Sequence, residues 1–241
     1  MQQFPVTLQR SFEARIINND WAPETILDYS SLVEIFDCSV LELDKVLQSA
    51  IRKGLIKQIS KNAFLVQPIT KPDIQSVFQF ASNSGLKPES IVRELDVQNA
   101  YGEIAEKLKI PEGFPVFKQV RTRMVDQIVI ANQYNFIPYD VCPALESIDL
   151  THYSFQEALQ HDFNTIISSI NETYAIYHAT SSDTQILGLP EHEDVLRVER
   201  ISLTRNGNPV VWADIHVKIT EYAKIEKLWP GAKHIIGEYL K

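Results

Sequence analysis

Apolar side chains recur with helical spacing in three short stretches at the start of the chain. Residues 8–19, residues 29–36 and a third stretch that ends before Gly54 each carry them on one face. The third stretch begins at Ser39, and Glu42 follows three residues later, which is the spacing of a capping box. A glycine directly after a helical pattern is a common end signal. This region therefore predicts three helices.

Two short apolar runs come next, at residues 55–59 and 63–66, with a polar turn at 60–62 between them. They predict a two-stranded hairpin. Three helices and a hairpin in this order, within fewer than about 70 residues, are typical of a winged helix-turn-helix. The alternative is a small helical cap that packs on a larger domain.

A proline-containing stretch follows the hairpin. Pro68 and Pro72 both favour extended backbone, which is typical of a linker. We therefore expect a head at residues 1–67, a linker at 68–74 and a second domain at 75–241. The total of 241 residues is ample for two separate hydrophobic cores.

The second region contains an internal near-repeat. Residues 108–112 and 187–191 are similar, and each precedes an apolar strand that runs into a polar turn, at 126–127 and 206–207 respectively. A second strand leaves each turn, and an amphipathic helix at 154–163 lies between the copies. The pattern predicts an α+β domain with a mostly antiparallel sheet. Two similar halves commonly leave a cleft between them, where a ligand can bind.

Composition narrows the function classes. The net charge is −8 and the isoelectric point is about 5.3, which counts against a protein whose whole surface binds nucleic acid. Cys38 and Cys142 are far apart, and no Cys or His spacing suggests a metal site. No apolar run is long enough for a membrane span, and no signal-peptide core is present. We therefore expect a cytoplasmic protein without a metal or cofactor.

Motifs for catalysis are also missing. The sequence has no nucleophile elbow, no Walker loop and no Rossmann glycine fingerprint, and its histidines lack the HxxxH spacing of metal enzymes. An enzyme is therefore not expected.

Short motifs in the two predicted hairpins carry a family resemblance. The first hairpin holds Arg121-Thr122-Arg123, Asp126-Gln127, Gln133 and Phe136-Ile137-Pro138, and the second holds Gly207-Asn208-Pro209-Val210 and Val217-Lys218. In this order and spacing the motifs resemble those of the HutC-like branch of the GntR superfamily. Members of this branch join a winged helix-turn-helix to a UTRA effector domain, whose fold is chorismate-lyase-like.

The resemblance implies a function as well as a fold. It implies a bacterial transcriptional regulator, in the first instance a repressor, that binds double-stranded operator DNA as a homodimer. A small acidic or phosphorylated metabolite bound in the UTRA domain would control DNA binding. An enzyme of the chorismate-lyase type is a remote alternative, because it rests on the shared fold alone.

The head departs from the family pattern at the positions that usually contact DNA. Where the family has arginines, this chain has Ser30, Val40 and Asp44. Residues 1–69 hold seven Lys and Arg against eight Asp and Glu, a net charge of −1, whereas phosphate contacts need cations. Two readings stay open: a head that still reads DNA, and a head that has lost specific DNA binding and serves a ligand- or protein-binding regulator. The candidate DNA-binding residues are Ser39, Lys45, Arg52, Lys53, Lys57, Lys61 and Asn62.

The candidate effector site begins with two alternating arginines. Arg121 and Arg123 point to the same side of one strand, where they could clamp a carboxylate or phosphate by bidentate hydrogen bonds. The alternative is a solvated strand face. Gln133 stands where many family members have Glu. Arg200 is expected in a structural salt bridge.

Further effector candidates lie on the middle helix and the last strand. Ser154 and Gln156 open the helix, where free backbone N–H groups favour an anion, although Ser154 could simply be its N-cap. Trp212, Asp214 and His216 alternate on the last strand, and the latter two could bind a ligand or form a surface pair. The complete list is Arg121, Arg123, Gln133, Ser154, Gln156, Trp212, Asp214 and His216.

Overall fold

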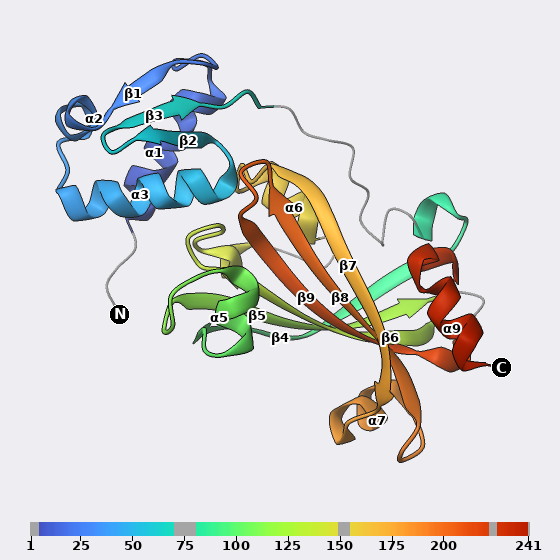
Figure 1. Ribbon diagram of the computed structural model, residues 1–241. Coiled ribbons are helices and arrows are strands. Elements are labelled where there is room, and N and C mark those ends of the chain that lie inside the picture. Colours follow the sequence, from blue (N-terminus) through green and yellow to red (C-terminus); the bar gives the residue numbers. More distant parts are fainter. Residues whose placement is uncertain (1–4, 70–80, 149–154, 222–225, 241) are drawn as a thin grey trace.

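The computed structural model describes residues 5–69, 81–148, 155–221 and 226–240. The head elements, in chain order, are α1 (Val6–Ile17), β1 (Ile26–Asp28), α2 (Tyr29–Phe36), α3 (Val40–Lys53), β2 (Ile56–Ser60) and β3 (Ala63–Val66) (Figure 1). The three predicted helices and the predicted hairpin are all present. The short strand β1, which the sequence pattern did not indicate, pairs with β3 and completes a three-stranded sheet in the order β1-β3-β2.

The start and end signals that the sequence predicts for α3 are both present in the structure. The backbone N–H of Glu42 donates to the Ser39 hydroxyl, and the Glu42 carboxylate accepts from the backbone N–H of Ser39, so the capping box is complete. Gly54 ends α3 with φ +79°, and a Cβ there would lie 3.3 Å from the Cβ of Thr204 in the second domain. The end of α3 is therefore both a left-handed cap and a point of close contact between the two domains.

The second domain is built on one six-stranded antiparallel sheet in the order β4-β5-β6-β9-β8-β7. Its elements are β4 (Pro88–Asn99), α5 (Glu103–Leu108), β5 (Pro115–Val125), β6 (Ile128–Pro138), η1 (Leu145–Ser147), α6 (Phe155–His161), β7 (Ile167–His178), α7 (Ser181–Leu187), β8 (Asp194–Thr204), β9 (Pro209–Lys218), η2 (Ile219–Glu221), η3 (Pro230–Ala232) and α9 (Lys233–Tyr239). The repeat is therefore strand, helix, strand, strand. The first strands of the two units, β4 and β7, were not predicted.

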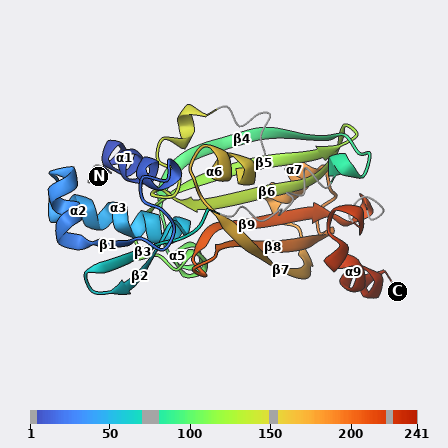
Figure 2. The same cartoon turned by 90° about the horizontal axis from the view of Figure 1, so that it is seen from above.

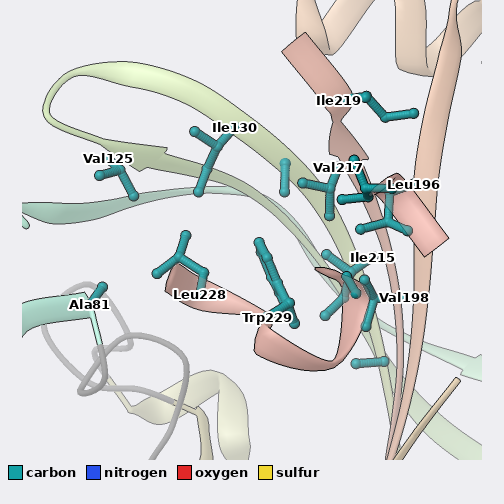
Figure 3. Packing of buried hydrophobic residues seen from close by; sticks show 14 residues of the cluster. Ala81, Val125, Ile130, Leu196, Val198, Ile215, Val217, Ile219, Leu228 and Trp229 are labelled. Carbon is teal, nitrogen blue, oxygen red and sulfur yellow. The ribbon is translucent and has the colours of Figure 1, made fainter. Parts of the chain in front are cut away.

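The two faces of this sheet are covered by different elements. Helix α5 packs on one face, where Leu108 joins a buried cluster with Phe136 and Trp212. Helix α7 also contacts β6. The opposite face is covered by the C-terminal segment, residues 226–240, whose Trp229 packs with Ile215 (Figure 3). The fold is α+β, as predicted.

The head lies beyond one end of the strands, next to the turn between β8 and β9 (Figures 1 and 2). The side-chain amide of Asn206 in this turn donates to the backbone carbonyls of Ile51 (3.0 Å) and Ile56 (2.9 Å). On the other side of α3, Arg52 forms an ion pair with Asp140 at 3.1 Å. The interface is thus fixed by directed hydrogen bonds as well as by contact. Among the described residues, no helix is both long and apolar enough to cross a membrane.

Candidate effector cavity and candidate DNA-binding face

A cavity of about 760 Å³, counted with its open mouth, lies on the face of the sheet beneath the C-terminal segment and α6. We call this side of the sheet the cavity face and the side under α5 and α7 the helix face. The strand register explains which residues reach the cavity face: Gln133 pairs with Ile215 and Asn135 pairs with Ala213, and paired residues share a face.

A chain of polar side chains runs across the cavity face. The guanidinium of Arg123 donates from Nε to the Gln133 Oε1 (2.7 Å) and from Nη1 to the Ser90 hydroxyl (2.6 Å). Gln133 in turn donates to Asn135 (2.7 Å), which donates to Gln119 (3.1 Å). The network fixes the guanidinium of Arg123, yet the partners that hold it are neutral.

Three arginines gather on this face. Burial, together with the like charges of Arg121 and Arg200, lowers the pKa of Arg123 to about 9. Burial also lowers the pKa of Arg121 to about 10, and that side chain is 1% exposed. Arg200 is paired with Glu172 at 2.6 Å, as expected, while it also lines the cavity. The local field at Arg123 therefore favours an anion.

The structure brings together only part of the predicted effector site. Arg123, Gln133 and Gln156 all line the cavity, and Arg121 lies on the same face without lining it. Ser154 lies outside the described residues. Helix α6 itself has seven residues.

Trp212, Asp214 and His216 point the other way, because they alternate with the β9 residues on the cavity face. Trp212 stacks on Phe136 with ring centroids 5.1 Å apart. These three residues do not line the cavity, so the structure separates them from the arginines. Strand alternation in the sequence shows that the three residues share a face, but it does not show which face holds the cavity.

The helix face instead holds a compact ion network. His216 Nδ1 lies 2.6 Å from an Asp183 carboxylate oxygen, and its Nε2 lies 3.4 Å from Asp214. Arg197 adds a bidentate pair to Asp214 at 2.8 and 2.9 Å. Burial alone would lower the pKa of His216, but its hydrogen bonds to Asp183 and Asp214 override this and raise the pKa to about 9. The network links α7 to the sheet and is fully paired internally.

Most cavity residues were not proposed from the sequence, among them Asn135 and Trp229. Asn135 could have been found, because it follows Gln133 by two positions on the same predicted strand. Trp229 gave no sequence signal, because it lies in a C-terminal segment with neither a motif nor a clear strand pattern. Its place in the cavity wall follows only from tertiary packing.

The candidate DNA-binding residues also divide into two groups. Lys57, Lys61 and Asn62 are exposed on the β2–β3 hairpin, and Lys45 is half-buried on α3. Ser39 is occupied as the N-cap of α3, where its hydroxyl remains exposed.

Arg52 and Lys53 do not fit a DNA-binding role. Lys53 is 1% exposed and its ammonium pairs with Glu13 at 2.7 Å. Arg52 pairs with Asp140 and lies over the ring of Phe114, 5.6 Å from its centroid. Both belong to the contact between head and second domain, because the last turn of α3 faces the sheet rather than solvent. The helical pattern could not show this, since it depends on where the second domain docks.

Comparison with known proteins identifies the family of the second domain. The model of the UTRA domain matches residues 83–223. The chain belongs to the UTRA-domain family. It is a HutC-like member of the GntR superfamily, and its homologues are transcriptional regulators.

Two relatives from Bacillus subtilis (strain 168) match nearly the whole chain. The HTH-type transcriptional regulator GmuR is 24% identical over 206 residues, covering 81% of this chain and 85% of GmuR. The HTH-type transcriptional repressor NagR is 21% identical over 209 residues, covering 83% of this chain and 84% of NagR.

Solved structures show the same fold. PhnF from Mycobacterium smegmatis superposes with a TM-score of 0.55 at 13% identity, covering 88% of this chain and 94% of PhnF. The possible transcriptional regulator YydK from Bacillus subtilis gives a TM-score of 0.54 at 18% identity, covering 89% and 96%. The arrangement of head and sheet domain is therefore shared with GntR-family regulators.

Proposed function

We propose that this GntR-type regulator binds operator DNA through a head at residues 1–67 and responds to a small anionic metabolite held in a UTRA domain at residues 75–241. The observation that carries the proposal is Arg123, a guanidinium on a half-enclosed cavity whose hydrogen-bond partners are neutral and whose charged neighbours Arg121 and Arg200 repel it. A carboxylate or phosphate would relieve this repulsion and accept a charge-assisted hydrogen bond.

A short path joins the cavity to the head. Ile167 lines the cavity, while its neighbour Ile166 packs in the hydrophobic core of the head. The backbone N–H of Ile166 also donates to the carbonyl of Lys53 at 3.1 Å. A ligand that shifts the start of β7 therefore acts directly on the end of α3. Such a shift changes DNA affinity only if the ligand binds the two arrangements with different affinity.

The proposed sense of regulation follows a relative, and the proposed assembly follows from the symmetry of operators. NagR is a repressor, and we propose repression for this chain too. We also propose a homodimer, because paired heads match the two half-sites of a typical operator. The homologues are regulators, and we propose that this chain has no catalytic activity.

Thermal unfolding tests the ligand site. Small carboxylates and phosphates are screened against the wild type, Arg123→Gln and, as a matched control, Arg10→Gln on the exposed face of the head. We expect at least one anion to raise the melting temperature of the wild type and of the control but not of Arg123→Gln. An anion that stabilises all three proteins equally would place the site elsewhere.

A second candidate function has a specific observation in its favour. The start of α3 exposes Val40 and Leu41, at 58% and 57% of their surfaces, and Glu42 and Asp44 are exposed nearby. The hydroxyl of Tyr29 donates to Asp44 at 2.7 Å, which keeps this carboxylate at the helix surface. An apolar and acidic surface suits a protein partner better than phosphates. A mobility-shift assay at low salt decides between the two: absence of any retarded DNA would favour the protein-binding function.

A further inference from the structure

Two residues of the C-terminal segment, Leu228 and Trp229, form part of the cavity wall. Both are buried, at 4% and 2% exposure, and both lie against the sheet near Ile215 (Figure 3). The match to the UTRA domain ends at residue 223, so this wall lies beyond the part of the chain that the family model describes. The segment is therefore a place where this protein can set its own ligand preference.

The segment is held closely against the polar side of the cavity. A Cβ added to Gly231 would lie 2.6 Å from the hydroxyl of Tyr174, so only glycine allows this approach. The hydroxyl of Tyr174 donates to Glu172, which in turn pairs with Arg200 of the cavity wall. The position of Trp229 is thus tied to the arginine side of the site.

Trp229 lines the cavity, and its indole carries a hydrogen-bond donor. Its indole Nε1 is buried and has no hydrogen-bond acceptor among the described residues. A buried donor without an acceptor costs free energy, and a native protein usually satisfies it. An acceptor on a ligand in this cavity would do so, at the same time as it contacts Arg123.

The rest of the lining is mostly hydrocarbon. Apolar side chains from β5, β6, β7 and β9 contribute, together with Leu228 and the ring of Trp229: Val125, Ile130, Ile167, Val211, Ala213 and Ile215. Phosphorylated sugars expose hydroxyl groups all around, and few of these would find partners on such walls. A single negative charge suits Arg123, whose partners are Gln133 and Ser90, because the second cavity arginine, Arg200, is already paired with Glu172.

We infer that the cavity binds a monocarboxylate with an apolar or aromatic body, and that Trp229 selects it. The carboxylate accepts from Arg123 and from the Trp229 indole N–H, and the apolar body packs on Leu228, Ile130 and Ile215. This inference rests on the proposed function, because it names the ligand class of the same site.

Isothermal titration tests the ligand class with five probes on the full chain. Three are apolar monocarboxylates (3-phenylpropanoate, indole-3-acetate and octanoate), and the others are glucose 6-phosphate and the uncharged 3-phenylpropanol. We expect at least one of the carboxylates to bind at least tenfold more tightly than glucose 6-phosphate and 3-phenylpropanol. If glucose 6-phosphate binds and the three carboxylates do not, the inferred class is wrong while the anion site stands. If none of the five binds, both the class and the proposed anion site are contradicted.

A pair of tryptophan variants tests the role of Trp229. Trp229→Phe keeps the aromatic wall but removes the N–H, and we expect carboxylate binding about tenfold weaker. Trp212→Phe is the matched control, because its indole N–H is likewise buried with no acceptor in the described part of the chain but lies on the helix face. Equal affinity of both variants and the wild type, with unchanged melting temperatures, would overturn the assignment of Trp229.

Discussion

The buried ion pair between Lys53 and Glu13 shows an ionisable residue with a structural role. Lys53 and Glu13 meet at 2.7 Å with side chains 1% and 5% exposed, and Glu13 also accepts from Gln9 at 2.7 Å and from Asn164 at 3.2 Å. Asn164 belongs to the second domain, so this pair stabilises the head at the surface where the two domains meet. A lysine that appeared free to contact DNA is therefore part of the interior.

Replacing Lys53 tests this assignment. Lys53→Met leaves the Glu13 carboxylate buried without its cation, and we expect the free energy of unfolding to fall by about 3–5 kcal/mol. Urea denaturation measures the loss. The double variant Lys53→Met, Glu13→Gln should recover part of it, because no buried charge is then left alone. A loss below about 1 kcal/mol in the single variant would show that the pair is solvated.

His216 predicts a pH dependence of stability. Its folded pKa of about 9 is above the ordinary value of 6.5, so its contribution is fully present below pH 6.5 and is lost as pH rises toward 9. Asp183 and Asp214 face the ring, Arg197 holds Asp214, and Tyr177 packs against the ring.

Unfolding experiments from pH 6 to pH 9.5 should show this loss directly. We expect wild type to exceed His216→Gln in stability by up to about 3 kcal/mol near pH 6 and the difference to shrink through pH 9. A difference that stays constant over this range would contradict the assigned pKa.

At the scale of elements, sequence patterns predicted the helices and turns whose formation depends on neighbouring residues. Helix α3 has a cap at each end, and each hairpin turn has its own polar residues, so both could be read from neighbouring positions. Strands β4 and β7 were missed because much of each is half-exposed, which leaves no clean alternation of apolar and polar residues. They form strands because β4 pairs with β5 and β7 pairs with β8. The arginine side of the cavity was predicted from strand alternation, whereas its closing wall required the tertiary packing of Trp229.

The turn between β8 and β9 gives a prediction at this scale. Asn206→Ala removes the donor to the carbonyls of Ile51 and Ile56, and we expect the head to loosen from the second domain by about 1–2 kcal/mol. Faster hydrogen exchange at the last turn of α3 would report this. Asn206→Gln is a better control than Gly207→Ala in the same turn. It keeps a side-chain amide, so its exchange rate shows whether a longer amide restores the contact. Unchanged exchange in Asn206→Ala would mean that the other contacts between the domains, such as the Arg52–Asp140 ion pair, hold them together without this amide.

At the scale of the whole molecule, the charge of the head limits how it can bind DNA. With Arg52 and Lys53 committed to the domain contact, Lys45, Lys57 and Lys61 are the cations that remain among the predicted DNA contacts. Three phosphate contacts on each head of the proposed dimer predict a slope of about −5 in a plot of log affinity against log salt concentration. Lys57→Gln changes both heads, so it should reduce the slope by about two and leave sequence preference unchanged. A slope near −8 would show that other cations carry the binding.

The central claim is that occupation of the cavity controls the head. The most direct measurement titrates DNA, selected from a random-sequence library by the wild-type protein, into wild type and Arg123→Gln with and without an anion that binds the cavity. We predict that the anion weakens DNA binding by wild type at least fivefold and leaves the Kd of Arg123→Gln unchanged. An anion that saturates the wild-type cavity without changing its Kd for DNA would contradict the claim.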